Sequence, residues 1–245
     1  MPERFSGRDL SGHAFSQADL SGMDFTGSNL TGATFVRVKL DHVDLTGTIL
    51  RGVRFTRTSL VGARLCGADL TRAWLRGASL AGADLSGAKT PGANLRQADL
   101  SGATMTGVWM YSATLSGARL PHASLVRADL TRADLGETDL SRADLSAARL
   151  IETDLTGARL VDAILRDADM LWARLRQANL AGADLRGVRL FQADLRGAHL
   201  EGADMTGADL AGAKGVSGVS GSPDDWTEVE ELPSNPTGFW SERDA

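Results

Sequence analysis

Large apolar side chains recur at every fifth position along most of the chain. From Phe5 to Leu210, each position divisible by five holds Leu, Phe or Met, with Thr90 as the one exception. Two positions earlier stands a small or β-branched residue, most often Ala. Since residues two apart share one side of an extended chain, this pattern predicts a short strand with both apolar side chains facing inward. A frequent Gly two positions after the large residue predicts a turn, so each quintet forms one side and one corner.

The spacing of the phenylalanines predicts how many sides make one coil. Phe5 and Phe25 are 20 residues apart, and Phe15, Phe35 and Phe55 form a second set with the same interval. Four quintets per coil would stack each set at the strand spacing of about 4.8 Å. The sequence therefore predicts an all-β solenoid of about ten square coils, with its function on the outer faces or at the ends.

The repeat ends after Lys214, and the composition changes there. We expect a repeat domain over residues 1–215 and a linker and tail over residues 216–245. Residues 215–223 are rich in Gly and Ser, which is typical of a linker.

A short amphipathic helix is predicted over residues 223–232. This segment begins with Pro and acidic residues, and Val229 and Leu232 follow Trp226 along one side. A disordered acidic tail is the alternative. If the segment binds the rod or a second subunit, its anchors are Trp226, Phe239 and Trp240.

Composition argues against most catalytic and membrane functions. No apolar run approaches the about 18 residues of a membrane-spanning helix and no secretory signal is apparent, so we expect a soluble cytoplasmic protein. The single cysteine, Cys66, excludes a disulfide framework. His42 and His122 would lie roughly 19 Å apart, too far to share a metal ion. We expect no catalytic residues, no metal and no cofactor.

The quintets closely resemble those of the pentapeptide repeat proteins. The unit A-(D/N)-L-x-x stands as ADLSG at 83–87, ANLRQ at 93–97 and ADLRG at 183–187. The resemblance covers about 210 of the 245 residues. It implies a right-handed quadrilateral β-helix.

The resemblance also implies a kind of function. Qnr quinolone-resistance proteins and the self-immunity proteins of topoisomerase-poison producers bind DNA gyrase or topoisomerase IV and protect it. A non-enzymatic protein with this role in antibiotic resistance or self-immunity is the leading hypothesis, although the loops of several Qnr groups are missing here. A scaffold rod for another protein partner is the alternative. Related gyrase-binding members dimerise through a C-terminal segment, which implies a homodimer.

Surface charge tests whether the rod could be a DNA mimic. Residues 216–245 carry seven of the 31 acidic residues and one of the 26 basic residues. This leaves residues 1–215 with 24 acidic and 25 basic residues. A duplex of similar length would carry about 30 negative charges, so mimicry could only be partial. The side that contains Phe5 is the most acidic. Its candidate protein-binding residues, each also at the family's consensus acid position, are Asp24, Asp44, Asp84, Asp144, Asp184 and Asp204.

The side that contains Phe15 is the most basic. Direct nucleic-acid binding there is a third hypothesis, but the pattern is more typical of a solvated face, so we expect neither nucleic-acid nor membrane binding. The arginines concerned are Arg54, Arg57, Arg76, Arg96, Arg174 and Arg176.

An apolar stripe follows the side that contains Leu10, at positions where the repeat predicts exposed residues. A contiguous apolar patch with aromatic residues is typical of an interface. We expect the tail or a second subunit to cover it, with a foreign partner as the remaining option. The stripe consists of Trp109, Tyr111, Ile151, Leu171, Trp172 and Phe191.

Overall fold

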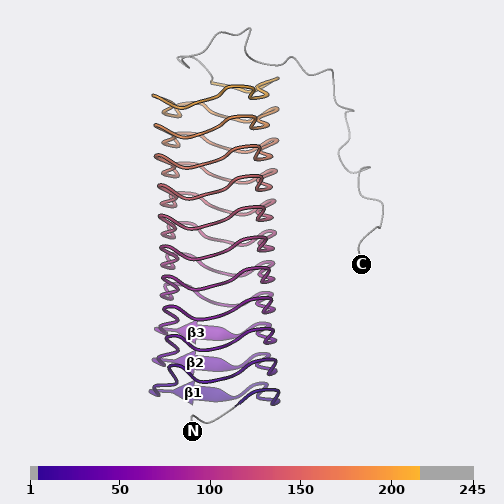
Figure 1. Ribbon diagram of the computed structural model, residues 1–245, viewed down its shortest axis with the longest axis vertical. Coiled ribbons are helices and arrows are strands. Elements are labelled where there is room, and N and C mark those ends of the chain that lie inside the picture. Colours follow the sequence, from indigo (N-terminus) through magenta and orange to yellow (C-terminus); the bar gives the residue numbers. More distant parts are fainter. Residues whose placement is uncertain (1–4, 216–245) are drawn as a thin grey trace, which may run out of the picture.

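The computed structural model describes residues 5–215, which form a rod of stacked coils (Figure 1). Three parallel strands, β1 (Ala14–Ser16), β2 (Thr34–Val36) and β3 (Arg54–Thr56), lie side by side near the N-terminal end. The predicted all-β repeat fold is confirmed.

The other sides of these coils, and all sides of the later coils, are joined by single parallel bridges instead of longer strands. Each bridge links residues 20 apart, from Asp9 with Asn29 to Asp194 with Lys214. The register of β1, β2 and β3 has the same interval. The predicted 20-residue coil is therefore present along the described rod, whereas its right-handed winding stays a prediction of the resemblance.

One continuous apolar core runs along the axis of the rod. The large residue of each quintet and the small residue two positions earlier face inward, and most are fully buried. The predicted phenylalanine stacks are present: the ring centroids of Phe5 and Phe25 are 4.7 Å apart, as are those of Phe15 and Phe35. Thr90 fits the apolar column because its Oγ1 donates a hydrogen bond to the Trp109 carbonyl oxygen at 3.2 Å.

The corners explain why glycine recurs two positions after each large residue. This corner residue has a left-handed backbone, which glycine adopts with the least strain. Other residues also occupy it, including Arg57 with φ of 52° and Ala147 with φ of 55°. The left-handed corner is therefore a property of the coil, and glycine only reduces the backbone strain at this position.

Replacing Gly107 by Ala is expected to lower the free energy of unfolding by about 1 kcal/mol. Gly107 has φ of 62°, and an added Cβ would meet no atom within 4 Å, so the cost comes from the backbone alone. Ala147→Gly reverses this change at an equivalent corner and should stabilise the rod slightly. Urea denaturation measures both, and an unchanged stability of Gly107→Ala would contradict the strained corner.

The predicted linker, helix and anchors Trp226, Phe239 and Trp240 lie outside the described residues, so the division at residue 215 stays a prediction. Within residues 5–215, no helix has the length and apolar character that crossing a bilayer requires.

Candidate binding surfaces

The outer surface of the rod has four sides, which we number by their first fully described coil. Side 1 contains Phe25, side 2 contains Leu30, side 3 contains Phe35 and side 4 contains Leu40, and each side recurs every 20 residues. The residues just before and after each of these inward-facing positions point away from the core. Because side chains fill the interior, any partner of the described rod must bind to these sides or to the ends.

The aspartates of side 1 are part of the turns that close the quintets. Asp144 Oδ1 accepts hydrogen bonds from the backbone N–H of Ser146 at 2.9 Å and from its hydroxyl at 2.6 Å. The same bond from the backbone two residues on recurs at Asp24, Asp44, Asp84 and Asp204. This bond gives the consensus acid a structural role, because a side-chain oxygen that accepts a hydrogen bond from the backbone two residues on stabilises a tight turn.

Neighbouring cations reduce the negative charge of side 1. Asp184 accepts hydrogen bonds from Arg186 Nε and Nη2, both at 2.8 Å, and from Arg166 Nε at 2.5 Å. The Arg186 hydrogen bonds are the largest cause that holds the pKa of Asp184 well below its usual range. Asp44 lies 3.7 Å from Arg64 Nη1, and Asp204 lies 3.6 Å from Arg186 Nε.

The structure brings the six predicted aspartates onto one side but not into one acidic surface. Arg64, Thr104, Ser124 and Ile164 stand between them in the same column of bridges. Five of the six are only half exposed, and Asp204 is exposed. The role of this column in protein binding stays a prediction.

The N-terminal end of the apolar stripe on side 2 is exposed. Trp109 is 57% exposed and Tyr111 is 44% exposed. The ammonium of Lys89 lies 5.5 Å from the centre of the Trp109 ring, and Arg132 Nη1 donates a hydrogen bond to the Tyr111 hydroxyl at 3.1 Å. Arg132 is itself paired with Glu152, whose carboxylate oxygen lies 2.9 Å from Nε. We call Lys89, Trp109, Tyr111 and Arg132 the aromatic patch.

The C-terminal end of the stripe packs largely against the rod itself. Leu171 is only 6% exposed, so the expectation that it lies on the outer surface is wrong. Trp172 and Phe191 form an edge-to-face pair with centroids 5.9 Å apart, and both are half-buried, as is Ile151. Apolar side chains stacked in successive coils thus cover one another. Only Trp109 and Tyr111 keep a large exposed area.

Arginines on side 3 differ between the two halves of the rod. Arg174 Nη2 lies 3.2 Å from Asp154, and Arg176 Nε lies 3.6 Å from Asp194. Arg54, by contrast, lies over the Trp74 ring, with its guanidinium carbon 5.9 Å from the ring centre. Sequence reasoning missed Trp74, although tryptophan at an outward-facing position of the repeat was a visible signal.

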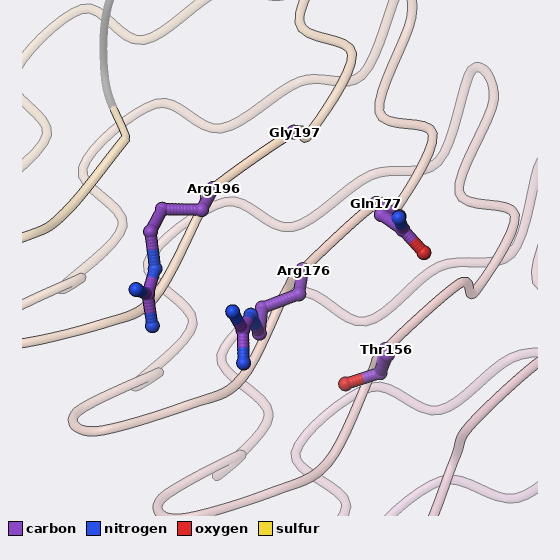
Figure 2. Close-up of a pocket in the computed structure, with 5 residues that line it drawn as sticks. All are labelled: Thr156, Arg176, Gln177, Arg196 and Gly197. Carbon is purple, nitrogen blue, oxygen red and sulfur yellow. The ribbon is translucent and has the colours of Figure 1, made fainter.

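A shallow depression of about 450 Å³ lies near the C-terminal end of side 3, where Arg176 and Arg196 extend from successive coils (Figure 2). Arg196 binds Asp194 through Nε at 2.8 Å and Nη2 at 2.5 Å, which lowers the pKa of Asp194 to about 2. The carboxylate neutralises much of the charge that an anionic ligand would need. The remaining lining residues are Thr156, Gln177 and Gly197.

Two observations concern the potential nucleophile and metal-ligand groups of the described residues. Burial, and then the hydrogen bond to Asp84 at 3.0 Å, raise the pKa of the Cys66 thiol to about 11, so it is a poor nucleophile at neutral pH. Within residues 5–215, no three His, Cys, Asp or Glu side chains are grouped so that they could hold a metal ion.

Comparison with known families agrees with the geometry. The family model described as Pentapeptide repeats matches eight copies, over residues 9–52, 48–87, 78–117, 110–146, 143–182 and 183–214. The chain belongs to the pentapeptide repeat family. No curated protein matches this pentapeptide repeat protein.

Two solved pentapeptide repeat structures show the extent of the likeness. HetL from the cyanobacterium Nostoc sp. strain PCC 7120, described as involved in heterocyst differentiation regulation, is 34% identical; the match covers 87% of this chain and 91% of HetL, with a TM-score of 0.51. A trypsin-treated variant of QnrB1, a plasmid-mediated fluoroquinolone resistance protein, is 22% identical, with 84% and 90% covered and a TM-score of 0.46. At that identity and TM-score, the likeness to QnrB1 supports no statement about this chain.

Proposed function

We propose that this pentapeptide repeat protein is a non-enzymatic binding rod that holds a protein partner against its lateral surface. The observation that carries this proposal is the aromatic patch on side 2. Neighbouring exposed apolar side chains with a polar rim mark interaction sites on soluble proteins, and tryptophan, tyrosine and arginine dominate the energetics of protein interfaces.

The aromatic patch is preorganised for such a contact. The pair formed by Arg132 and Glu152 holds the Tyr111 hydroxyl, and Lys89 lies over one ring of Trp109. The rings stand on a wall of hydrogen-bonded coils, so little backbone freedom is lost when a partner binds. A rigid aromatic centre with a charged rim favours a protein as the ligand.

The partner that we propose first is DNA gyrase or topoisomerase IV, with protection from topoisomerase poisons as the outcome. Support for this partner comes from the family resemblance. The charge distribution favours contact through the aromatic patch over mimicry of DNA phosphates, because side 1 is interrupted and several of its carboxylates are paired. We further propose that two rods pair through their C-terminal regions, which sedimentation can test.

Supercoiling by gyrase in the presence of a quinolone tests the proposal. At micromolar concentration the protein should shift the quinolone sensitivity or the supercoiling activity, and Trp109→Ala combined with Tyr111→Ala should weaken this effect about 10-fold or more. Trp74→Ala is the matched control, since Trp74 is 53% exposed on another side. No effect of the wild type on gyrase and topoisomerase IV from its host would retire this partner. Full activity of the double variant would show that the aromatic patch is not the contact surface.

A scaffold rod in a regulatory complex is the second candidate function. It is favoured by the likeness to HetL, which is described as involved in heterocyst differentiation regulation and is 34% identical over 87% of this chain. A stable complex with a regulatory protein that requires Trp109 and Tyr111, together with inactivity on both topoisomerases, would decide for this alternative.

A further inference from the structure

The N-terminal half of side 3 carries arginines without any acidic residue. Across the quintets from residue 13 to residue 117 on this side there is no Asp or Glu. Five arginines stand there on successive coils, and all are exposed, as is Trp74. We call this set the basic strip; it consists of Arg37, Arg54, Arg57, Trp74, Arg76 and Arg96.

Most of the strip's positive charge has no counter-charge on the described rod. Of the five arginines, only Arg96 makes an ion pair within residues 5–215, a long contact of 3.5 Å to Asp134 two coils away. Acidic groups on the adjacent sides have other partners: Arg51 Nε lies 2.6 Å from Asp69, and Asp99 accepts a hydrogen bond from the Ser101 hydroxyl. The strip therefore has an unsatisfied positive potential centred on an exposed indole.

The same chain contains a segment of complementary chemistry. Residues 224–231 read DDWTEVEE, with five carboxylates around Trp226. The described chain ends on side 3, since its last bridge joins Asp194 to Lys214 and Gly215 follows in the same quintet position as Phe15. The segment after Gly215 thus starts on the side that carries the strip.

The length of the connection matches the distance to the strip. From Gly215 to Arg96 is about six coils of 20 residues, or about 29 Å along the rod at the strand spacing. The nine residue steps from Gly215 to Asp224 span at most about 32 Å when extended. Residues 224–231 could then run alongside the strip, whose three coil steps from Arg37 to Arg96 measure about 14 Å. The reach of the connection, the side on which it starts and the charge of residues 224–231 are all consistent with binding to the basic strip.

We propose that residues 224–231 dock on the basic strip of their own rod, with carboxylates paired to its arginines and Trp226 beside Trp74. This inference is independent of the proposed function, because the strip is on side 3 and the aromatic patch is on side 2. Docking in this way covers the strip and excludes other anionic ligands from it. Intramolecular attachment makes it effective even if each ion pair is weak, since the local concentration of a tethered segment reaches the millimolar range.

Limited proteolysis of the full chain tests the docking. A glutamyl endopeptidase should cleave after Glu228, Glu230 and Glu231 about 10-fold faster when Arg57, Arg76 and Arg96 are all changed to Gln. Raising the salt to about 0.5 M should accelerate cleavage of the wild type in the same direction. Arg127→Gln on side 1 is the control, because Arg127 shares the left-handed corner conformation of Arg57, with φ of 56° and 52° respectively. Equal cleavage rates in the wild type and the triple variant would overturn the proposal.

Disulfide trapping in the full chain locates the contact. In a Cys66→Ser background, Thr227→Cys should form an intrachain disulfide with Asn94→Cys, which stands next to Trp74 in the bridge column of side 3. The comparison variant places Cys at Thr131 on side 2. Preferential trapping at Thr131, or disulfides only between chains, would overturn docking on the same rod. A third result would also overturn the proposal. In it, the wild type binds a single-stranded oligonucleotide and the triple Gln variant does not, while the protease cleaves both proteins at the same rate.

Discussion

Leu145→Asp is expected to destabilise the rod by about 4–5 kcal/mol or more, because it removes a large buried side chain and places a carboxyl group in a dry core. Leu145 has no exposed surface, and its neighbours in the core are the leucines and alanines of its own and adjacent coils. Urea denaturation followed by circular dichroism measures the loss. Since each coil contacts only its neighbours, partial unfolding around residue 145 would also appear as reduced ellipticity without denaturant.

Leu145→Met is the control for this change. Met has a similar volume and already occupies equivalent positions at Met105 and Met110, both fully buried, so its cost should stay below about 1.5 kcal/mol. A Leu145→Asp variant as stable as the wild type would contradict the assignment of every fifth residue to the interior.

The interior could be predicted from the sequence because the five-residue and 20-residue periods together allow only one arrangement of the inward-facing side chains. A five-residue repeat with strand parity puts the large and small residues of each quintet inside, and two phenylalanine series at intervals of 20 fix the coil. Phe35 and Phe55 illustrate this, with ring centroids 5.1 Å apart in the observed stack. The acid before each large residue was predicted only as a consensus residue; its turn-closing bond, as at Asp144, became visible once the geometry was known.

The outer surface could not be predicted in the same way, because exposure there depends on side chains 20 residues away. Leu171 occupies a position that the repeat predicts to be exposed, yet Ile151 and Phe191 stand before and after it in the same column, and it is buried. Tyr111 occupies the same position, and its neighbours there are the smaller Pro91 and Thr131; it stays 44% exposed. Long arginine side chains add pairings such as Arg132 with Glu152, which depend on rotamers that no period specifies.

Acidification is expected to destabilise the rod strongly, because many of its carboxylates have a pKa below the ordinary value. Hydrogen bonds from Arg186 and Arg196 lower the pKa of Asp184 and Asp194, and Thr206 has the same effect on Asp204. A carboxyl group whose pKa is lower in the folded state contributes stability that is fully present above its unfolded value of about 4. This contribution is lost as the pH falls through the folded pKa, which for Asp194 is about 2. Stability should therefore decline between about pH 4 and pH 2.

Asp184→Asn isolates one of these contributions. Asn keeps an oxygen that can accept the turn-closing bond, as Asn179 does from the N–H of Ala181 at 3.1 Å, but it loses the charge that binds Arg166 and Arg186. The variant should be about 1 kcal/mol less stable than the wild type at pH 7, because hydrogen bonds to charged groups exceed neutral ones by about that much. The difference should shrink as the pH falls below about 4, because the contribution of the wild-type carboxyl is lost progressively as the pH approaches its lowered pKa.

Asp169 on side 2 should respond in the opposite direction. Burial raises its pKa despite Arg189 Nη1 at 3.1 Å, so its ionised form is a cost to the folded state at neutral pH. Protonation relieves this cost as the pH falls through the raised pKa, and Asp169→Asn should remove that rise while leaving the decline below pH 4 intact. Urea midpoints measured from pH 7 to pH 2 for the wild type, Asp184→Asn and Asp169→Asn separate the two effects. Parallel profiles for all three proteins would contradict the assignment of both carboxyl groups.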